Sequence, residues 1–400
     1  MKILGHDFKL YYYLAFRRGY SFDSTPGLLL SQSQSWTELR RTSLHFLRDL
    51  GMGKSGFDDL INQEVDNFVQ FIDENYLNQP VDIDPFFNRA TVAIIWRIIS
   101  NESLMIGCPR LEKMYNAAKM IAVEFGDSFI QSTIDKESVF YWVQKLGFSK
   151  MKTYFDDMFE EFETLIQNLK SSQIDDDENP ATITEQYVKK MKEITDENHV
   201  LFGSRGHLNL LNVLSDLIIA GSDTSANALQ WSMLYLMLHP EHQWRIVEEA
   251  DLDEKPFTEA FLWEVHRKGK VVPTSVFHVT NEDTEVKDYF LPKGTIIIPL
   301  IGEIMRNPEY FPNPEVFDPE RYLTYDNDKL HCHPHPKLIP FGIGRRRCLG
   351  EPIANVSLKT FVSKLLQKYE LVPASKLQDL PREGYIKGPM PFKMIFKPRK

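Results

Sequence analysis

Residues 341–350, FGIGRRRCLG, present a cysteine whose sulfur is placed to face a group that needs a thiolate. Gly344 and Gly350 can adopt backbone conformations closed to other residues, so we expect a tight loop that aims amides at the sulfur of Cys348. From residue 351 to about residue 369 the apolar residues recur at helical spacing. A helix beginning there places its positive end beside the cysteine and favours the charged sulfur.

A second set of side chains that could do chemistry lies within residues 207–239, a stretch that is apolar on nearly all sides. If helical throughout, this stretch is about 50 Å long, and its composition predicts a buried helix. Residues 220–224, AGSDT, interrupt it with polar groups, which are costly in an apolar setting unless they are used. The hydroxyl of Thr224 can bond back to the carbonyl of Ala220 and loosen the helix locally, and Asp223 precedes it.

A third set consists of charged residues on one helical face. Residues 257–268, FTEAFLWEVHRK, predict a helix on which Glu264 and Arg267 are three apart and can pair. Exposed pairs of this kind are common and contribute less than about 1 kcal/mol, so the pair alone predicts little. Residues 317–323, FDPERYL, follow in the chain and supply a second arginine, Arg321.

The elements that position these groups are mostly helices. Residues 36–54 place leucines on one helical face before Gly51, and Trp36 and Arg40 lie one turn apart on that helix. Apolar periodicity predicts further helices, and β-branched content predicts two strands. We expect the helices over residues 59–76, 86–100, 113–125 and 153–172, a loop over 175–180, and the strands over 271–280 and 295–302 with a turn at 291–294 between them.

Composition bounds the class of protein. The chain has 400 residues, is 42% apolar and 12% aromatic, and can bury a large core. Because no Gly/Ser/Pro linker divides it, we expect a single domain over residues 1–400. The net charge of −10 argues against nucleic-acid binding, and three scattered cysteines (Cys108, Cys332 and Cys348) indicate a reducing compartment rather than a disulfide framework. No run approaches the roughly 18 apolar residues of a membrane span, and the opening segment is too polar for a signal peptide.

A histidine cluster at residues 331–335, HCHPH, raises the question of a metal site. Zinc needs spaced ligands on a framework that makes them converge. Alternating histidines on a loop with prolines are more often solvated, and we expect a solvated loop here.

The cysteine loop resembles a known signature. All fixed positions of the cytochrome P450 haem-thiolate motif, F-x-x-G-x-R-x-C-x-G, are matched, by Phe341, Gly344, Arg346, Cys348 and Gly350. Residues 36–54, which end in LRDLGMGK, resemble the animal family 2 clan in particular. The resemblance implies a mainly α cytochrome P450 fold with small peripheral β-sheets and a haem b cofactor (iron protoporphyrin IX). It also implies that Cys348 is the axial iron ligand, which pushes electron density onto the iron so that an O–O bond can break.

The same resemblance assigns roles to the other candidate residues. Thr224 donates a hydrogen bond to dioxygen, and Asp223 helps to relay protons. We expect the haem propionates to contact Trp36, Arg40, Arg346 and His278. We expect the substrate to contact Ala220, Thr274, Ser275 and Val276, beneath a roof formed by residues 125–148. A buried structural network that holds the cysteine loop is expected from Glu264, Arg267 and Arg321. Such a network must be complete, because losing one partner strands the others.

The activity that the resemblance implies is that of a monooxygenase. It inserts one atom of dioxygen into an apolar organic substrate (xenobiotic, steroid or lipid-like) and reduces the other to water. Electrons come from NADPH through NADPH-cytochrome P450 reductase, and cytochrome b5 is a further candidate donor. Relatives of this type act at the cytosolic face of the endoplasmic reticulum membrane and begin with a hydrophobic anchor, a hinge and the first β-strands. The chain looks N-terminally truncated by comparison, and we expect it to be soluble or peripheral as written.

Two departures and two alternatives qualify this prediction. Residues 248–257 are shorter than is usual in the family, and Asn355 stands where relatives often carry arginine, which weakens the expected coupling to a partner. Cations lie near the cysteine, and apart from Arg346, which is expected at a propionate, they suit an acidic partner, namely Arg41, Arg48, Lys54, Arg345 and Arg347. One alternative is an enzyme of the same fold that rearranges peroxides without a reductase, against which the intact Asp223 and Thr224 argue. The other is a truncated chain without haem or activity, because strands such as residues 295–300 would lose pairing partners.

Overall fold

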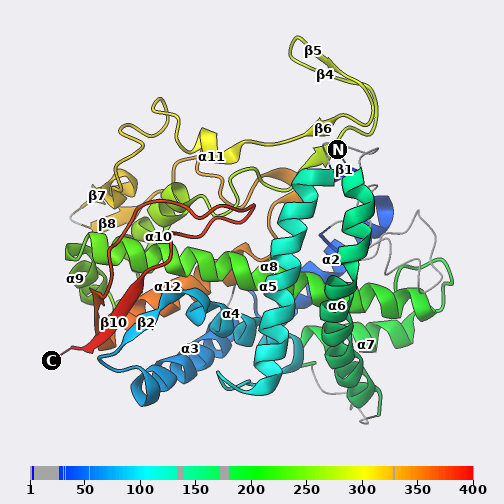
Figure 1. The fold of residues 1–400 in the computed structure, drawn as a ribbon, viewed down its shortest axis with the longest axis horizontal. Helices are drawn as coiled ribbons and strands as arrows, with labels where there is room; N and C mark the ends of the chain where they lie inside the picture. The colour runs from blue at the N-terminus through cyan, green and yellow to red at the C-terminus, as the bar shows by residue number, and fades with distance from the viewer. Residues whose placement is uncertain are drawn as a thin grey trace.

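A computed structural model gives the structure of the protein and describes residues 2–3, 27–29, 31, 33–53, 55–132, 139–171, 180–327 and 329–399. The described part is mainly α-helical, and its strands form small antiparallel sheets at the periphery (Figure 1). The predicted fold class is therefore confirmed. The loop expected over residues 175–180 lies almost wholly outside the described residues.

Helix α8 (Gly203–Leu238) crosses the whole molecule and runs unbroken through its centre (Figure 1). Apolar side chains cover nearly all of its circumference, as the sequence predicts, so it is buried by neighbours rather than by one face. Its most extensive partner is α4 (Ile83–Ser100). Gly221 permits this close approach, because a Cβ atom there would lie 2.8 Å from the side chain of Ile95.

The other helices surround α8. The predicted helices that carry or flank the site are present with bounds close to those expected. Helices α5 and α6 stand side by side across the direction of α8 (Figure 1). The bounds are α2 Ser33–Asp49, α3 Ser55–Asn75, α5 Pro109–Ser132, α6 Val139–Ser171, α7 Ile183–Glu193, α9 Glu241–Glu248, α10 Pro256–Gly269, α11 Ile301–Ile304 and α12 Glu351–Lys368, with 3-10 helices η1 Pro319–Tyr322 and η2 Gly344–Arg346.

Phenylalanines tie α12, the helix that follows the cysteine, into the core. Phe361 of α12 lies edge-on to Phe68 of α3, with ring centroids 5.4 Å apart, and to Phe87 of α4 at 6.1 Å. Phe86 joins the same group to Phe68 at 4.9 Å. These rings are nearly fully buried, and their packing fixes α12 relative to α3 and α4.

The sheets are short. One has the order β1-β3-β6 and another β2-β10-β9, and two hairpins pair β4 with β5 and β7 with β8. In the first sheet His278 pairs with Ile3 on one side and Ile297 on the other. The bounds are β1 Lys2–Ile3, β2 Pro80–Asp82, β3 His278–Val279, β4 Thr284–Val286, β5 Tyr289–Leu291, β6 Ile296–Ile297, β7 Leu323–Asp326, β8 Lys329–Cys332, β9 Tyr369–Pro373 and β10 Lys393–Pro398.

The strands predicted over residues 271–280 and 295–302 are much shorter than expected. Only β3 and β6 are extended there, and residues 301–302 belong to α11 instead. Pro273 and Pro299 carry no N–H to donate to a neighbouring strand, and Ser275 has a φ of 51°, which an extended strand does not allow. The segment before β3 is therefore an irregular loop.

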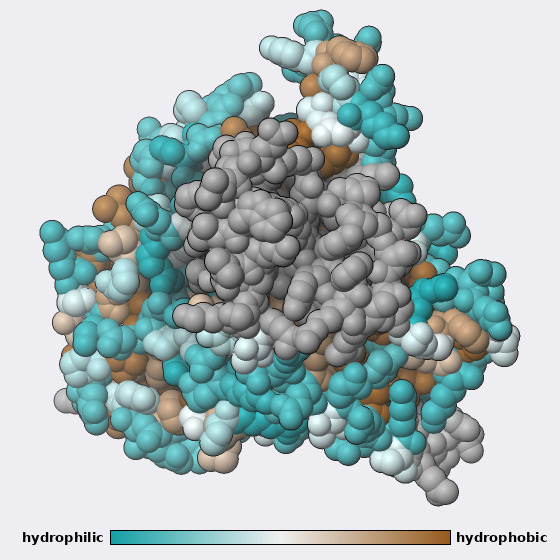
Figure 2. Space-filling view, turned by 45° about the vertical axis from the view of Figure 1, so that its right-hand side comes forward, coloured by the Kyte–Doolittle hydropathy of each residue, from teal (hydrophilic) through white to brown (hydrophobic). Residues whose placement is uncertain are grey.

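One apolar feature projects from the molecule. The β4–β5 hairpin stands away from the helices (Figure 1), and brown apolar atoms mark the same projection in Figure 2. Its exposed apolar side chains include Val286, Tyr289 and Phe290. Within the described residues, no helix combines the length and the apolar character that crossing a bilayer requires.

Candidate active site

Cys348 lies on a loop between η2 and α12 that its own backbone closes. The N–H of Cys348 donates to the carbonyl of Phe341 at 2.9 Å. Gly344 has a φ of 71°, as predicted, but Gly350 has an ordinary φ of −83° and caps α12, so the expectation for Gly350 was wrong. The other left-handed residue is Gly342, with a φ of 73°. The turn needs its glycines before the cysteine, where the backbone reverses, rather than after it.

The thiol of Cys348 is set in an enclosed position. Burial is the largest cause that raises its pKa, while hydrogen bonds from the backbone N–H of Gly350 and Glu351 and the charge of Arg40 act to lower it. The helix terminus thus acts in the predicted direction, but burial outweighs it. The side chain is nevertheless accessible. A sulfur that is screened from bulk solvent but not covered by protein atoms would be both desolvated and accessible. A thiolate in such a place needs a positive partner such as a metal ion.

The centre of α8 is more accessible than the helix segments on either side of it. Residues on both sides of the AGSDT segment are buried, whereas Ala220 is exposed and Thr224 is only half-buried. The Thr224 hydroxyl donates to the carbonyl of Ala220 at 2.6 Å, which is the bond that the sequence predicts. The helix stays continuous across it.

Asp223 belongs to a polar network that sequence reasoning missed. Asn88 of α4 donates to its carboxylate at 3.0 Å, and Gln230 donates to Asn88 at 3.3 Å. Arg382 donates to Gln230 at 3.0 Å and to Asp84 at 2.6 Å. Burial is the main cause that raises the pKa of Asp223, and the charge of Arg382 opposes it. No local pattern signals Arg382, because its partners lie far away in the sequence.

The guanidinium groups of Arg346 and Arg40 both lie near the ring of Trp36, and we call these three residues the cationic platform. The guanidinium carbon of Arg346 lies 3.5 Å from the centroid of the Trp36 ring, and that of Arg40 lies 5.7 Å from it. Arg346 donates one bond, to the carbonyl of Ser31 at 2.9 Å. Arg40 donates to the carbonyl of Arg347 at 2.5 Å and so contacts the backbone of the cysteine loop. Arg40 and Arg346, the two arginines that we expect at the propionates, therefore lie near the same indole ring.

Two buried nitrogens near this platform have no protein partner. Nη1 of Arg346 and Nδ1 of His278 are both buried and make no hydrogen bond within the described residues. The pKa of His278 is lowered by burial first, and the charge of Arg346 contributes. Burial and the charges of Arg40 and Arg345 lower the pKa of Arg346 to about 10. Unpaired buried donors beside like charges are unfavourable unless an anionic group binds there, so these residues fit the carboxylates of a porphyrin.

Glu264 and Arg267 form a buried ion pair within a larger network. Both side chains are fully buried, and Arg267 donates to the two carboxylate oxygens at 2.8 Å each. Arg321 donates to the same carboxylate at 3.2 Å. Tyr322, which sequence reasoning missed although it follows Arg321, donates to Glu264 at 2.9 Å. The N–H of Asp318 donates to Glu264 as well, at 2.9 Å, so the carboxylate fixes η1 beside α10.

The residues expected at the substrate lie in the loop before β3. Thr274, Ser275 and Val276 are half-buried there, and the carbonyl of Ser275 accepts a bond from the hydroxyl of Tyr385 at 2.5 Å. The side chains of most of the expected roof over residues 125–148 lie outside the described part of the structure. Lys54, one of the cations expected at a partner surface, also lies outside it.

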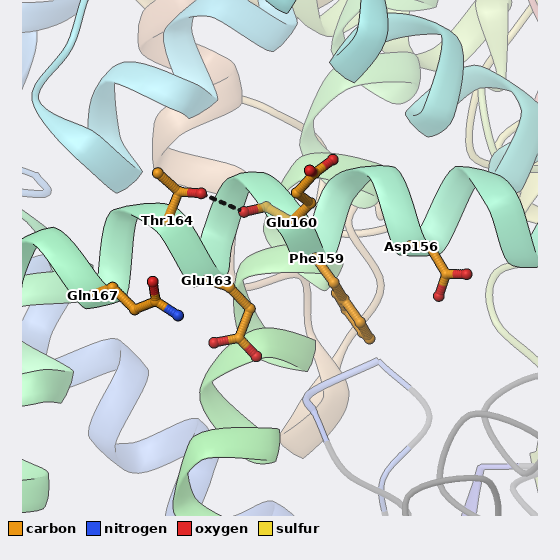
Figure 3. A pocket seen from close by; sticks show the side chains of 6 residues that line it. All are labelled: Asp156, Phe159, Glu160, Glu163, Thr164 and Gln167. Carbon is orange, nitrogen blue, oxygen red and sulfur yellow. Dashed lines mark hydrogen bonds between the residues drawn. The ribbon is translucent and has the colours of Figure 1, made fainter.

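A surface recess on α6 is separate from these groups. Its lining residues all come from α6 (Figure 3), and the carboxylate of Glu163 pairs with His207 of α8 at 2.9 Å. A recess with walls from one helix cannot enclose a substrate. We therefore place the candidate active site at the cysteine loop and the AGSDT segment of α8 rather than at this recess.

The features of a haem-thiolate oxidoreductase are a thiol enclosed on a glycine-turned loop, buried nitrogens without a protein partner on Arg346 and His278, and a central helix that carries a hydroxyl group. The cytochrome P450 family model matches residues 3–396, and the chain belongs to the cytochrome P450 family. It is therefore a haem-iron monooxygenase that takes dioxygen, an organic substrate and a redox partner.

Curated relatives come from animal family 2. The chain is 27% identical over 402 residues to cytochrome P450 2H1 of Gallus gallus and 29% identical over 401 residues to cytochrome P450 2C23 of Rattus norvegicus, in each case over 93% of this chain and 77% of the relative. It is 27% identical over 403 residues to cytochrome P450 2L1 of Panulirus argus, over 93% of this chain and 78% of the relative. The predicted family and clan are confirmed.

Proposed function

We propose that the chain binds haem b through Cys348 and oxidises apolar organic substrates with electrons from NADPH-cytochrome P450 reductase at the cytosolic face of the endoplasmic reticulum. The observation that carries this proposal is the pair of buried, unpartnered nitrogens on Arg346 and His278. Arg346 belongs to the loop whose thiol has a raised pKa and lies over the ring of Trp36, and its charge acts on His278 of β3. An iron porphyrin would supply a partner for the thiolate and for the unpartnered nitrogens, because its metal stabilises a thiolate and its carboxylates accept hydrogen bonds from such donors.

Haem, when bound, supplies the iron chemistry that activates dioxygen. The residues of α8 then govern protons. Burial raises the pKa of Asp223, so its carboxyl group holds a proton more readily near neutral pH than an ordinary one. Thr224 is adjacent and its hydroxyl both donates and accepts hydrogen bonds. Together they provide a proton source at the exposed turn of an otherwise buried helix.

The choice of electron donor rests on exposed cations beside the cysteine loop. Arg345 is exposed on the loop, and Arg41 and Arg48 are exposed on α2. Arg347, by contrast, pairs with Glu351 at 2.6 Å. These exposed cations suit an acidic flavoprotein, with cytochrome b5 as a second donor for the same surface, in a chain whose net charge is −10. Salt should therefore slow electron transfer from the reductase.

The test is the spectrum of the reduced carbon monoxide complex of the unmodified chain. We expect haem uptake and the red-shifted Soret band that reports a thiolate ligand. Cys348→Ala should abolish this band, while Cys332→Ala, which removes a partly buried thiol elsewhere, should leave it unchanged. A chain that takes up no haem, or a band that survives Cys348→Ala, would refute the proposal.

A further inference from the structure

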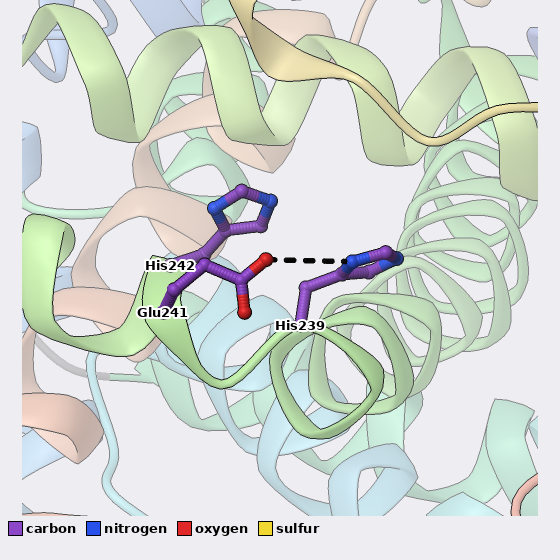
Figure 4. Close-up of side chains that lie close together, drawn as sticks. All are labelled: His239, Glu241 and His242. Carbon is purple, nitrogen blue, oxygen red and sulfur yellow. Dashed lines mark ion pairs between the residues drawn. The ribbon is translucent and has the colours of Figure 1, made fainter.

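Three side chains that can bind a metal ion converge where α8 ends and α9 begins. His239, Glu241 and His242 each offer a ligand atom, and these atoms all lie within 4.8 Å of one another. Nδ1 of His239 is 3.7 Å from the carboxylate of Glu241. Figure 4 shows the carboxylate between the two imidazole rings, on one side of the turn. Within the described residues this is the group in which such ligands converge, and it lies at the C-terminal end of α8, away from the AGSDT segment.

The backbone holds the three side chains in this arrangement. The N–H of His242 donates to the carbonyl of His239 at 3.0 Å, which closes the turn. His239 is itself anchored to α8, because its N–H donates to the carbonyl of Tyr235 at 2.9 Å. Pro240 fixes the backbone between the two histidines. The ligands are therefore presented by a preformed turn rather than by a mobile loop.

His242 lacks the partner that a buried imidazole needs. Its side chain is only 9% exposed, and its Nδ1 is buried without a hydrogen-bond partner in the described structure. Aromatic rings enclose it, with the centroid of Phe257 at 5.4 Å and that of Phe317 at 6.0 Å. Buried polar atoms of native proteins are almost always satisfied, so the unpartnered Nδ1 marks His242 as an imidazole that the described protein groups do not satisfy.

A neighbouring cation has its own acidic partner, so the carboxylate of Glu241 remains available to bind a metal ion. Arg245, the cation one turn further along α9, pairs with Glu320 and lies over the ring of Phe257, 3.6 Å from its centroid. Its charge is thereby directed away from Glu241. The side chain of Glu241 is 63% exposed and that of His239 is 34% exposed, so water can complete the coordination of an ion held here.

The ligand set selects a class of metal. Two imidazole nitrogens and one carboxylate oxygen suit a borderline-soft divalent ion such as Zn²⁺, whereas Mg²⁺ and Ca²⁺ prefer oxygen ligands. We propose that His239, Glu241 and His242 bind one divalent transition-metal ion of the zinc class, with water in the remaining positions. His239 follows Thr224 by fifteen positions, about 22 Å along α8, so this ion is distinct from the haem iron. It would fasten the end of α8 to α9.

The histidines at residues 331–335 provide a matched comparison. Their ligand atoms do not form such a convergent group in the described structure. The rings of His331 and His333 are 6.1 Å apart, and His335 uses its Nδ1 to accept a bond from the N–H of Lys337. A variant in this cluster therefore removes a histidine without touching the proposed site.

The experiment measures zinc bound per haem-loaded chain. The protein is stripped with a chelator, equilibrated with Zn²⁺ by dialysis, and analysed for zinc by plasma mass spectrometry, with iron measured as the index of folded holoenzyme. We expect one zinc per chain in the unmodified protein and in His333→Ala. His239→Ala and Glu241→Gln change accessible side chains and should keep the iron content while lowering zinc affinity by at least about tenfold.

A second measurement tests direct ligation and stability. Co²⁺ in place of zinc should give visible absorption bands, and Zn²⁺ should raise the melting temperature of the unmodified chain and of His333→Ala alone. Absence of bound zinc in the unmodified protein would overturn the proposal. So would full zinc binding by His239→Ala and Glu241→Gln, or loss of zinc in His333→Ala.

Discussion

His266 of α10 lies edge-on against Phe341 of the cysteine loop, with the ring centroids 5.0 Å apart. This contact joins the helix of the Glu264 network to the loop that presents Cys348. A side-chain hydrogen bond with Asn355 on α12 holds the other side of the imidazole.

The first prediction concerns the pH dependence of stability. Burial lowers the pKa of His266 from 6.5 to about 4. Between these values the unfolded chain binds a proton at this imidazole and the folded chain does not, so the free energy of unfolding decreases as pH falls through the window. From pH 7 to pH 5 this residue should account for a loss of about 2 kcal/mol. Urea unfolding at the two pH values measures it.

His266→Gln is the matched variant for this effect. Glutamine does not titrate and can still bond to Asn355, so its loss of stability between pH 7 and pH 5 should be smaller than that of the unmodified chain by the same amount. His45→Gln serves as a control because His45 is exposed on α2. Equal losses in His266→Gln and the unmodified chain would show that the buried imidazole does not carry the effect.

The second prediction concerns Glu264. Glu264→Ala leaves Arg267, Arg321 and the Tyr322 hydroxyl without their shared carboxylate, and breaking a buried charged network costs about 3–5 kcal/mol. We expect largely haem-free protein, measured by the ratio of Soret to protein absorbance. Arg306→Ala is the control, because its pair with Glu315 is exposed and contributes less than about 1 kcal/mol. Normal haem content in Glu264→Ala would show that the network is dispensable.

Local patterns predicted the helices and the central site motifs. The apolar periodicity of α8, α10 and α12 is contained within each segment, so their bounds lie close to those expected. Cys348 and Thr224 are predicted site residues for the same reason, since each lies in a contiguous motif. Tyr322 was within reach as well, because it follows Arg321 in FDPERYL and its hydroxyl needs a partner when buried.

Features that depend on distant partners were not predictable. The strands around His278 pair with segments far away in the sequence, and prolines within the predicted ranges restrict them to two residues each. Arg382 reaches the network of Asp223 from the C-terminal region, and no spacing indicates it. The left-handed glycine at position 342 rather than 350 depends on where the loop reverses, which composition does not show.

The third prediction concerns Arg346. Arg346→Met keeps the length of the side chain but removes a cation that is buried beside Arg40 and Arg345. A charge-assisted hydrogen bond to a propionate contributes about 1.5–3 kcal/mol, so haem should leave the variant roughly 10 to 100 times faster. Transfer of haem to an excess of apomyoglobin measures the rate. Arg41→Met is the control, because Arg41 is exposed on α2, and an unchanged release rate in Arg346→Met would exclude the proposed contact.

The fourth prediction concerns proton delivery by α8. A positioned proton donor contributes about 100-fold or more to a step that depends on it. Thr224→Ala removes the hydroxyl that bonds to Ala220, so most reducing equivalents should emerge as hydrogen peroxide rather than oxidised substrate. Thr224→Ser retains a hydroxyl and should stay coupled. Asp223→Asn keeps an oxygen for the bond from Asn88 but carries no acidic proton, and it should slow product formation without loss of haem. Peroxide and product are measured per NADPH consumed. Tight coupling in Thr224→Ala, or an unchanged rate in Asp223→Asn, would show that protons arrive by another route.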